Sequence, residues 1–349
     1  MGLASALLLA GVSPAQARPA LALITLSKVA GPPTSRVTVQ GSGFGASETI
    51  DLKFDVRFIA TAQSDATGSF SKKITVPKAA LPGNHLVKAK GESSGLFAQA
   101  TFTVRTDWPT FHFGMDRTGY NPYENVLSAA NVSQLVPKWT ASLNGVVNTS
   151  PIIAGGVVYV GAQSTHSGTL YAIDAATGAT IWSRDFTDCA IAPTVTNGIV
   201  YVATCLGDSV VALTAANGAT LWEKVTGAGV FNAPAVSGGV AYFGSDDGSL
   251  YAIDAGSGQT VWTSPDGGAG IGAPTVVGGV VYHVAASGPR LVALDAQSGS
   301  ILWSAPLPNF SENSAAVSGG NVYVGMANGP PYRGVSAYDA ATGSLVWNQ

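Results

Sequence analysis

The segment "SLYAIDAGSGQTVW" at residues 249–262 indicates a repeat protein, because it returns as "TLYAIDAATGATIW" at 169–182 and "RLVALDAQSGSILW" at 290–303. Each copy holds a short polar residue eight positions before a tryptophan. A catalytic group would not be copied into every repeat, nor be replaced by threonine in one of them. Asp or Thr ahead of an x-x-Gly turn instead accepts backbone N–H bonds and fixes the turn. These turn residues are Asp174, Thr214, Asp254, Asp295 and Asp339.

The tryptophans set the period of the repeat. They stand 40 to 44 residues apart, at Trp139, Trp182, Trp222, Trp262, Trp303 and Trp347. Each full interval contains four strand-length segments, most of them separated by Gly-Gly, Asn-Gly or Thr-Gly turns. Four antiparallel strands repeated at this period predict a β-propeller in which each tryptophan seals the contact between two blades.

Strand counting over residues 139–349 predicts five full blades and one extra outer strand, "PKWTASL", around Trp139. The last blade already has its own outer strand, "LVWNQ". We therefore expect the three partners of the strand around Trp139 to follow Gln349, in a truncated propeller of six to eight blades. Residues 105–138 are expected to form a linker and a lead-in segment.

Residues 21–104 follow a different pattern. Short alternating segments separated by Gly, Pro, Ser and Asn predict a small antiparallel sandwich of about seven strands. The phrases "VTVQGSGFGASETI" at 37–50 and "DATGSFSKKITVP" at 65–77 resemble the Ig-like, TIG-type modules of bacterial surface proteins. The resemblance implies the fold and says almost nothing about function. The segment shows no set of candidate ligands, so we expect a spacer or adhesion module. The chain as a whole is thus expected to be all-β.

The N-terminal residues indicate where the protein is located, and the overall charge limits the partners it can bind. Residues 1–17 contain an apolar run followed by Ala15-Gln16-Ala17, which is typical of a signal peptide cleaved before Arg18. No basic residue precedes the run, so the signal is expected to be incomplete at its start; an ordinary buried strand or helix is the alternative. The run is too short to span a bilayer.

A net charge of −3 without an evident Lys/Arg cluster argues against nucleic acid as a partner.

The phrases "SPIIAGGVVYVGA" at 150–162 and "LYAIDAATGATIW" at 170–182 resemble the tryptophan-docking repeat of the quinoprotein (PQQ-like) β-propeller superfamily. The resemblance covers residues 107–347. The superfamily includes alcohol dehydrogenases that depend on PQQ and calcium, polyvinyl-alcohol dehydrogenases, outer-membrane assembly lipoproteins of the BamB type, and surface proteins without a known reaction. The resemblance therefore implies the architecture more firmly than any activity.

Candidate binding residues are those that the repeat does not explain. The loops between the second and third strands of the blades vary in length and are expected to form the binding face. They carry His166, Asp208, Asp246, Asp247, Arg290 and Arg333. The expected channel mouth carries Asn148, Asn232, Glu312 and Asn313. Amide and carboxylate oxygens of this kind suit Ca²⁺, and a quinoprotein would hold PQQ and calcium there together. For every one of these residues a solvated surface role is the alternative, and no cofactor is expected.

Cys189 and Cys205 lie symmetrically about Asn197 in the hairpin "CAIAPTVTNGIVYVATC". If residues pair when their numbers add to 394, the two cysteines face each other, and we expect a disulfide; free thiols are the alternative.

Three functions remain open from the sequence. The first is an exported or cell-surface scaffold whose propeller binds a protein, a glycan or a small ligand. The second is a fragment of a PQQ- and calcium-dependent alcohol dehydrogenase, although the chain has neither vicinal cysteines nor a C-x-x-C-H segment. The third is a BamB-type envelope assembly factor. Such a lipoprotein would carry a lipobox cysteine near the signal cleavage site, and no cysteine occurs before Cys189.

Overall fold

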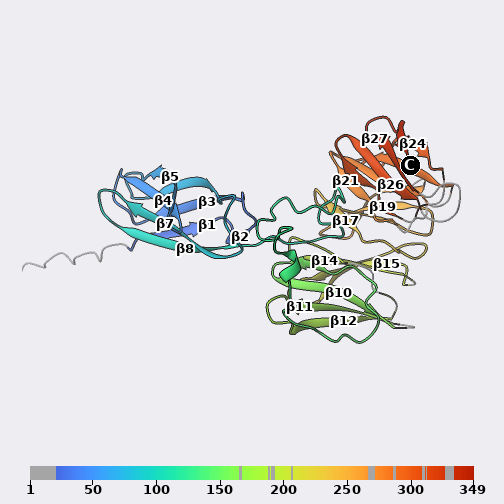
Figure 1. Cartoon of the computed structure of the whole chain (residues 1–349), viewed down its shortest axis with the longest axis horizontal. Helices are drawn as coiled ribbons and strands as arrows, with labels where there is room; N and C mark the ends of the chain where they lie inside the picture. Colours follow the sequence, from blue (N-terminus) through green and yellow to red (C-terminus); the bar gives the residue numbers. More distant parts are fainter. Residues whose placement is uncertain are drawn as a thin grey trace, which may run out of the picture. The chain divides into compact units, whose positions relative to one another are not determined.

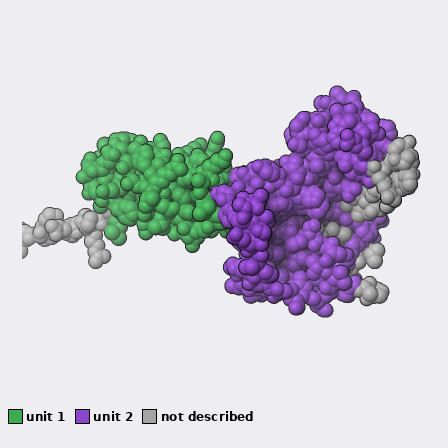
Figure 2. Space-filling view, in the orientation of Figure 1, with its two compact units in different colours: residues 1–106 green, residues 107–349 purple. Residues whose placement is uncertain are grey.

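The computed structural model describes residues 21–164, 167–187, 189, 193–205, 207–265, 272–285, 288–308, 311, 313–326 and 334–349. The chain separates into two compact units, residues 1–106 and 107–349, shown in different colours in Figure 2. Strands dominate both units, and the predicted all-β class is confirmed. Within the described ranges no helix is long and apolar enough to cross a membrane. The expected signal peptide, residues 1–17, lies outside these ranges.

In residues 21–106 two sheets pack around one core (Figure 1). Alternate residues of the strands point inward, and Val39, Ile50, Leu52, Ala89 and Phe102 are fully buried between the sheets. The first sheet has the order β1 (Leu23–Leu26), β3 (Arg36–Ser42), β6 (Phe70–Thr75). The second has the order β2 (Ala30–Gly31), β8 (Phe97–Val104), β7 (Gly83–Gly91), β4 (Thr49–Phe54), β5 (Arg57–Gln63).

The described residues of 107–349 form five four-stranded antiparallel sheets in chain order, which confirms the five predicted blades. Figure 1 shows them as an arc with the first and last blades at its ends. The strands of blades 1 to 3 are β9 (Ile152–Ala154), β10 (Val157–Gln163), β11 (Gly168–Asp174), β12 (Thr180–Phe186), β13 (Thr194–Thr196), β14 (Ile199–Thr204), β15 (Ser209–Thr214), β16 (Thr220–Val225), β17 (Ala235–Ser237), β18 (Val240–Gly244), β19 (Leu250–Asp254) and β20 (Thr260–Ser264). Those of blades 4 and 5 are β21 (Thr275–Val277), β22 (Val280–Ala285), β23 (Arg290–Asp295), β24 (Ile301–Pro306), β25 (Ala316–Ser318), β26 (Asn321–Met326), β27 (Gly334–Asp339) and β28 (Leu345–Asn348).

Turn chemistry explains the hairpins within each blade. Between the first and second strands, consecutive residues such as Gly238 (φ 59°) and Gly239 (φ 83°) both have positive φ. This is the type I′ turn, which matches the twist of a hairpin. Between the third and fourth strands of blade 1, Asp174 Oδ1 accepts the backbone N–H groups of Ala176 and Thr177 at 3.0 and 2.7 Å. The repeated aspartates therefore hold turns.

A repeated hydrogen-bonded contact joins each blade to the next. In blade 2, the Tyr201 hydroxyl and the Trp222 Nε1–H both donate to the carbonyl oxygen of Ala255 in blade 3, each at 3.0 Å. The acceptors of the other tyrosine–tryptophan pairs are Ala215, Ala296 and Ala340. We call this arrangement the inter-blade lock. One backbone carbonyl thus takes two donors from the neighbouring blade, and a buried acceptor of this kind is costly to leave unpaired.

The tryptophan ring also explains the glycine that ends each Asp turn. The ring of Trp222 lies over Gly258, where a Cβ atom would stand 2.8 Å from Cδ2 of the ring. Gly258 has a φ of 72°, so its backbone conformation is also unfavourable for any residue with a side chain. Two independent constraints therefore require glycine at this position.

The segment around Trp139 differs from its prediction. No strand is assigned to residues 137–143, because no neighbouring strand in the described structure completes a ladder with them. Trp139 nevertheless donates its Nε1–H to the Ala175 carbonyl at 3.0 Å and lies over Gly178. The Trp139 side chain therefore makes the same contacts with blade 1 that the tryptophan of one blade makes with the next blade, although no strand forms around it.

We predict that Gly258→Ala lowers the free energy of unfolding of residues 107–349 by about 2 to 4 kcal/mol, because it adds both backbone strain and a clash with Trp222. Gly288→Ala is the matched control, since Gly288 has a similar φ of 75° but open space where a Cβ atom would lie. The control should lose about 1 kcal/mol in urea unfolding. Equal losses in the two variants would show that the ring contact contributes nothing.

Candidate functional site

A disulfide joins Cys189 to Cys205, as predicted, with the Cα atoms 5.6 Å apart. The predicted register is wrong by one residue. Thr194 pairs with Tyr201 and Val195 with Val200, so partner numbers add to 395, because the turn consists of two residues, Asn197 and Gly198, both with positive φ. Cys189 precedes β13 and reaches Cys205 from outside the ladder. The bridge therefore ties the segment that enters blade 2 to the end of β14.

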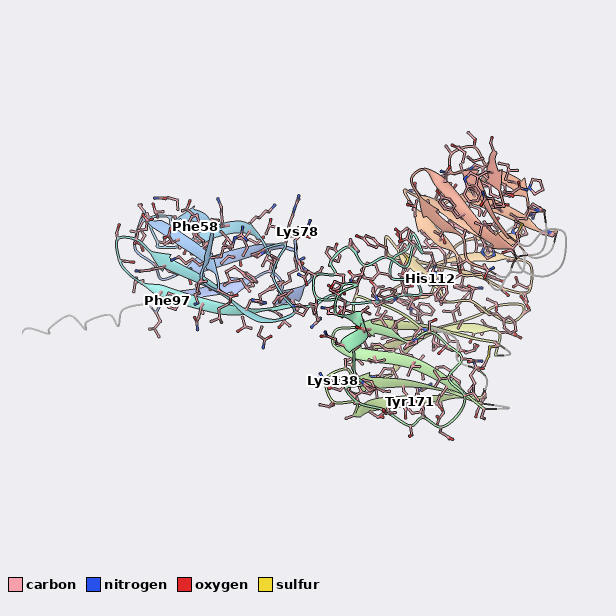
Figure 3. The ribbon with its side chains drawn as sticks, viewed as in Figure 1. Phe58, Lys78, Phe97, His112, Lys138 and Tyr171 are labelled. Atoms are coloured by element: carbon pink, nitrogen blue, oxygen red, sulfur yellow. A yellow bond between two sulfur atoms is a disulfide. The ribbon has the colours of Figure 1, made fainter. Side chains whose placement is uncertain are left out.

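The lead-in segment, residues 107–117, lies along the innermost strands. The free edges of these strands find backbone partners in it. Trp108 exchanges hydrogen bonds with Ile153 of β9, and the carbonyl of Pro109 accepts the N–H of Val195 in β13. Farther along, the carbonyls of Met115 and Asp116 accept N–H groups from β21 and β25 at 3.0 and 2.9 Å. The segment therefore satisfies the inner edges of four blades, and Figure 3 labels His112 within it.

Arg117 anchors the lead-in segment from within. Its side chain is buried, with 2% exposed, and its Nε and Nη2 atoms donate to the Pro274 carbonyl at 3.1 and 2.9 Å. Nη1 donates to the Phe111 carbonyl at 2.9 Å. Burial lowers the pKa of Arg117 to about 10, which still leaves it charged near neutral pH. Burial, reinforced by the nearby Arg117 charge, lowers the pKa of His112 below its ordinary value. The cation serves here as a donor to carbonyl groups.

Two of the predicted channel-mouth amides bind the backbone of their own blade. Nδ2 of Asn232 donates to the carbonyl of Gly244 at 2.9 Å, and Nδ2 of Asn313 donates to that of Gly325 at 3.1 Å. In blade 1 the hydroxyl of Thr149 donates to the carbonyl of Gly161 at 3.0 Å. Each pair is separated by 12 residues. This spacing is a further repeat, visible in the sequence but not used there.

The remaining predicted residues are dispersed. Asn148 donates to the Gln163 side chain at 3.4 Å, and Arg290 begins β23 opposite Ala285. His166, Glu312 and Arg333 lie outside the described residues. The described amides thus lie in separate blades, and the structure does not bring them together as one set of ligands. Nor do three or more His, Cys, Asp or Glu side chains gather into a metal-binding group within the described ranges. The described residues of this set therefore do not form one site that fits calcium and a quinone.

The best-defined polar group on the variable-loop face lies in the loop between β18 and β19. Asp247 Oδ2 accepts the Tyr251 hydroxyl at 2.5 Å and the Gly227 N–H at 2.9 Å. Partial burial alone would raise the pKa of Asp247, but these donors outweigh it and hold the pKa below its ordinary value. Burial and the adjacent Asp247 charge raise the pKa of Asp246, whose side chain is exposed. Both side chains are exposed, and hydrogen bonds fix the carboxyl group of Asp247.

We predict that Arg117→Met lowers the free energy of unfolding by about 2 kcal/mol, because the Pro274 carbonyl loses both of its side-chain donors. Arg184→Met is the control, since Arg184 makes only an exposed contact to Thr220 at 3.2 Å and should change stability by less than about 0.5 kcal/mol. Limited proteolysis should cut residues 107–119 faster in Arg117→Met. Unchanged cleavage would mean that Arg117 does not hold this segment.

Replacing both cysteines by serine should lower the free energy of unfolding by about 3 kcal/mol, the loss expected for opening a loop of this length. Urea unfolding with and without dithiothreitol measures the effect. The reductant should destabilise the unmodified chain and leave the double variant unchanged. An unmodified chain whose unfolding does not respond to dithiothreitol would contradict the assignment.

Comparison with known proteins places this geometry in a family. The family described as "Outer membrane protein assembly factor BamB" matches residues 116–185, 166–282 and 246–349. No curated protein matches. Among solved structures, BamB from Moraxella catarrhalis is 26% identical over 56% of this chain and 58% of that chain, with a TM-score of 0.47.

Two solved enzymes share the fold. A europium-containing methanol dehydrogenase is 16% identical over 70% of this chain and 58% of that one, with a TM-score of 0.59. The quinohemoprotein alcohol dehydrogenase ADHIIG from Pseudomonas putida HK5 is 19% identical over 70% of this chain and 48% of that one, with a TM-score of 0.52. The chain thus spans only 48 to 58% of the length of these three proteins. Since the family match covers more than half of the chain, this protein belongs to the BamB family of PQQ-like β-propellers.

Proposed function

We propose that this chain is an exported scaffold whose propeller binds a protein partner through the variable-loop face. The observation that carries the proposal is the use of the inner strand edges. The lead-in segment binds four of them, and Asn232 and Asn313 bind backbone carbonyls. Among the described residues, the loop between β18 and β19 offers the exposed side chains of Asp246 and Asp247 to a ligand. Variable loops on a rigid scaffold are the usual place for binding.

The family supports a protein as the partner. Its description names an outer membrane protein assembly factor, that is, a protein that acts on other proteins. The two dehydrogenases share the fold at 16 and 19% identity, which carries no activity across. A protein partner is consequently preferred over a small substrate or a glycan at the propeller.

Two features support a location outside the cytoplasm. A disulfide such as Cys189–Cys205 persists mainly in oxidising compartments. The sequence of residues 1–17 is typical of a signal peptide, and its removal would leave a chain that begins at Arg18. An exported chain is proposed on these grounds.

The two ends of one strand offer a matched test. A photo-crosslinking residue placed at Asp246, on the loop that leads into β19, should give a discrete protein adduct in producing cells. The same residue at Ser257, in the turn that follows β19, should not, because it lies on the opposite face of blade 3. Equal labelling from both positions would contradict a binding face. Dye-linked alcohol oxidation by the purified chain with PQQ and Ca²⁺ would contradict the scaffold role itself.

A further inference from the structure

The two units differ in charge. Residues 21–106 carry ten Lys and Arg against five Asp and Glu, whereas residues 107–349 carry six against fifteen. The near-neutral total of the whole chain conceals this difference. The basic side chains of the first unit are separated in the sequence, and their grouping becomes visible only in the strand register.

The strand register brings three of these lysines together on the solvent face of the five-stranded sheet. Lys53 of β4 lies directly opposite Lys88 of β7, and Lys90 of β7 lies opposite Asp51 of β4. The outer strands add aromatic rings to the same rows, because Phe58 of β5 pairs with Lys53 and Phe97 of β8 pairs with Lys90. We call Lys53, Lys88, Lys90, Phe58 and Phe97 the basic face; Figure 3 labels both phenylalanines.

The charges of the basic face do not help the sheet to fold. Like charges directly opposite in a sheet repel, as Lys53 and Lys88 must. On the same sheet, protonated His85 forms an ion pair with Asp55, with Nδ1 and Oδ2 2.7 Å apart. The other oxygen of Asp55 accepts the Leu86 N–H at 2.9 Å. Both oxygens of Asp55 are therefore engaged by other donors. The three lysines outnumber the two aspartates that line this face, so it keeps a net positive charge for an anion.

The same face is hollowed and apolar at its margins. A depression of about 280 Å³ is lined by the three lysines, by Asp51 and Asp55, and by Val56 and Phe97. The side chains of Phe58 and Phe97 are 53 and 51% exposed. Two half-exposed phenyl rings beside charged groups are unfavourable on a sheet face that contacts only water. A ligand with both charged and apolar surfaces would cover the rings.

We propose that the basic face of residues 21–106 binds an acidic polysaccharide through its carboxylate groups. The ammonium groups of Lys53, Lys88 and Lys90 pair with the carboxylates, and the two phenyl rings pack against the C–H faces of sugar rings. Strands lie about 4.8 Å apart, so β5 and β8, with β4 and β7 between them, are about 14 Å apart. A short stretch of polysaccharide that runs across the strands meets a ring at each end and lysines between.

This spacing disfavours single-stranded nucleic acid. Such proteins stack successive bases on neighbouring aromatic side chains. Here two lysine-bearing strands separate Phe58 from Phe97. A second copy of the chain, docked through its acidic propeller, is the other polyanion to be distinguished by experiment.

The test measures binding of the full chain to polygalacturonate at low salt by isothermal titration calorimetry. Lys53→Gln/Lys88→Gln should raise the Kd for polygalacturonate about tenfold, and 0.5 M NaCl should weaken binding of the unmodified chain. The matched control is Lys28→Gln/Lys73→Gln, which removes the same charge from exposed positions outside the face and should change the Kd less than twofold.

The aromatic contribution has its own control. Phe58→Ala/Phe97→Ala should raise the Kd about fivefold, whereas Tyr120→Ala, which removes a 68% exposed ring from the other unit, should leave it unchanged. Thermal unfolding of each variant establishes that the first unit still folds.

Four results would overturn the proposal. The unmodified chain could fail to bind polygalacturonate, or the Lys53→Gln/Lys88→Gln variant could bind it as tightly as the unmodified chain. An oligothymidylate could compete as well as polygalacturonate at equal charge concentration. Sedimentation could show that the same lysine substitutions abolish self-association of the chain, which would assign the face to a second copy. None of these results bears on the loop face of the propeller.

Discussion

One backbone carbonyl for each blade junction organises the second unit. The carbonyl of Ala255 accepts a hydroxyl from Tyr201 and an indole N–H from Trp222, and the same alanine position recurs in the other junctions. A four-stranded sheet of this size cannot bury both of its faces by itself. The buried clusters accordingly span pairs of blades: one joins Tyr201 of blade 2 to Phe243 of blade 3. Each blade junction thus combines the hydrogen bonds of the inter-blade lock with apolar packing between the two sheets.

Burial along the strands follows from this junction. In blade 2, which has neighbours on both sides, β14 and β15 are buried at almost every position. In blades 1 and 5, at the ends of the arc, the alternation returns, so that Tyr171 on β11 and Tyr323 on β26 are only partly buried. A neighbour on both sides thus buries β14 and β15 almost throughout, whereas β11 and β26 in the end blades alternate.

The sequence was sufficient for the blades but not for the site. Repeated turns and tryptophans are local signals, and they predict the five sheets because each hairpin depends on its own Gly-Gly or Asn-Gly pair. The register at Cys189 and Cys205 was missed by one residue, since a two-residue turn has no central residue. The lead-in segment, with Arg117 buried against Pro274, is a contact across 157 residues with no periodic signal. The grouping of Lys53 with Lys88 likewise depends on the pairing of β4 with β7.

The last blade shows the tyrosine–tryptophan pair of the lock without the carbonyl and the glycine of an adjoining blade. The rings of Tyr323 and Trp347 lie 6.0 Å apart at 49°, as in the other four tyrosine–tryptophan pairs, where the centroids are 5.8 to 5.9 Å apart. Trp347 is nevertheless 41% exposed, whereas Trp222 and Trp262 are each 9% exposed. The two donors are therefore positioned by their own sheet, and the adjoining blade contributes only the carbonyl and the glycine. A surface whose donors are already oriented loses little entropy when its partner arrives. This preorganisation explains how repeats of only about 40 residues can add to one another without each folding alone.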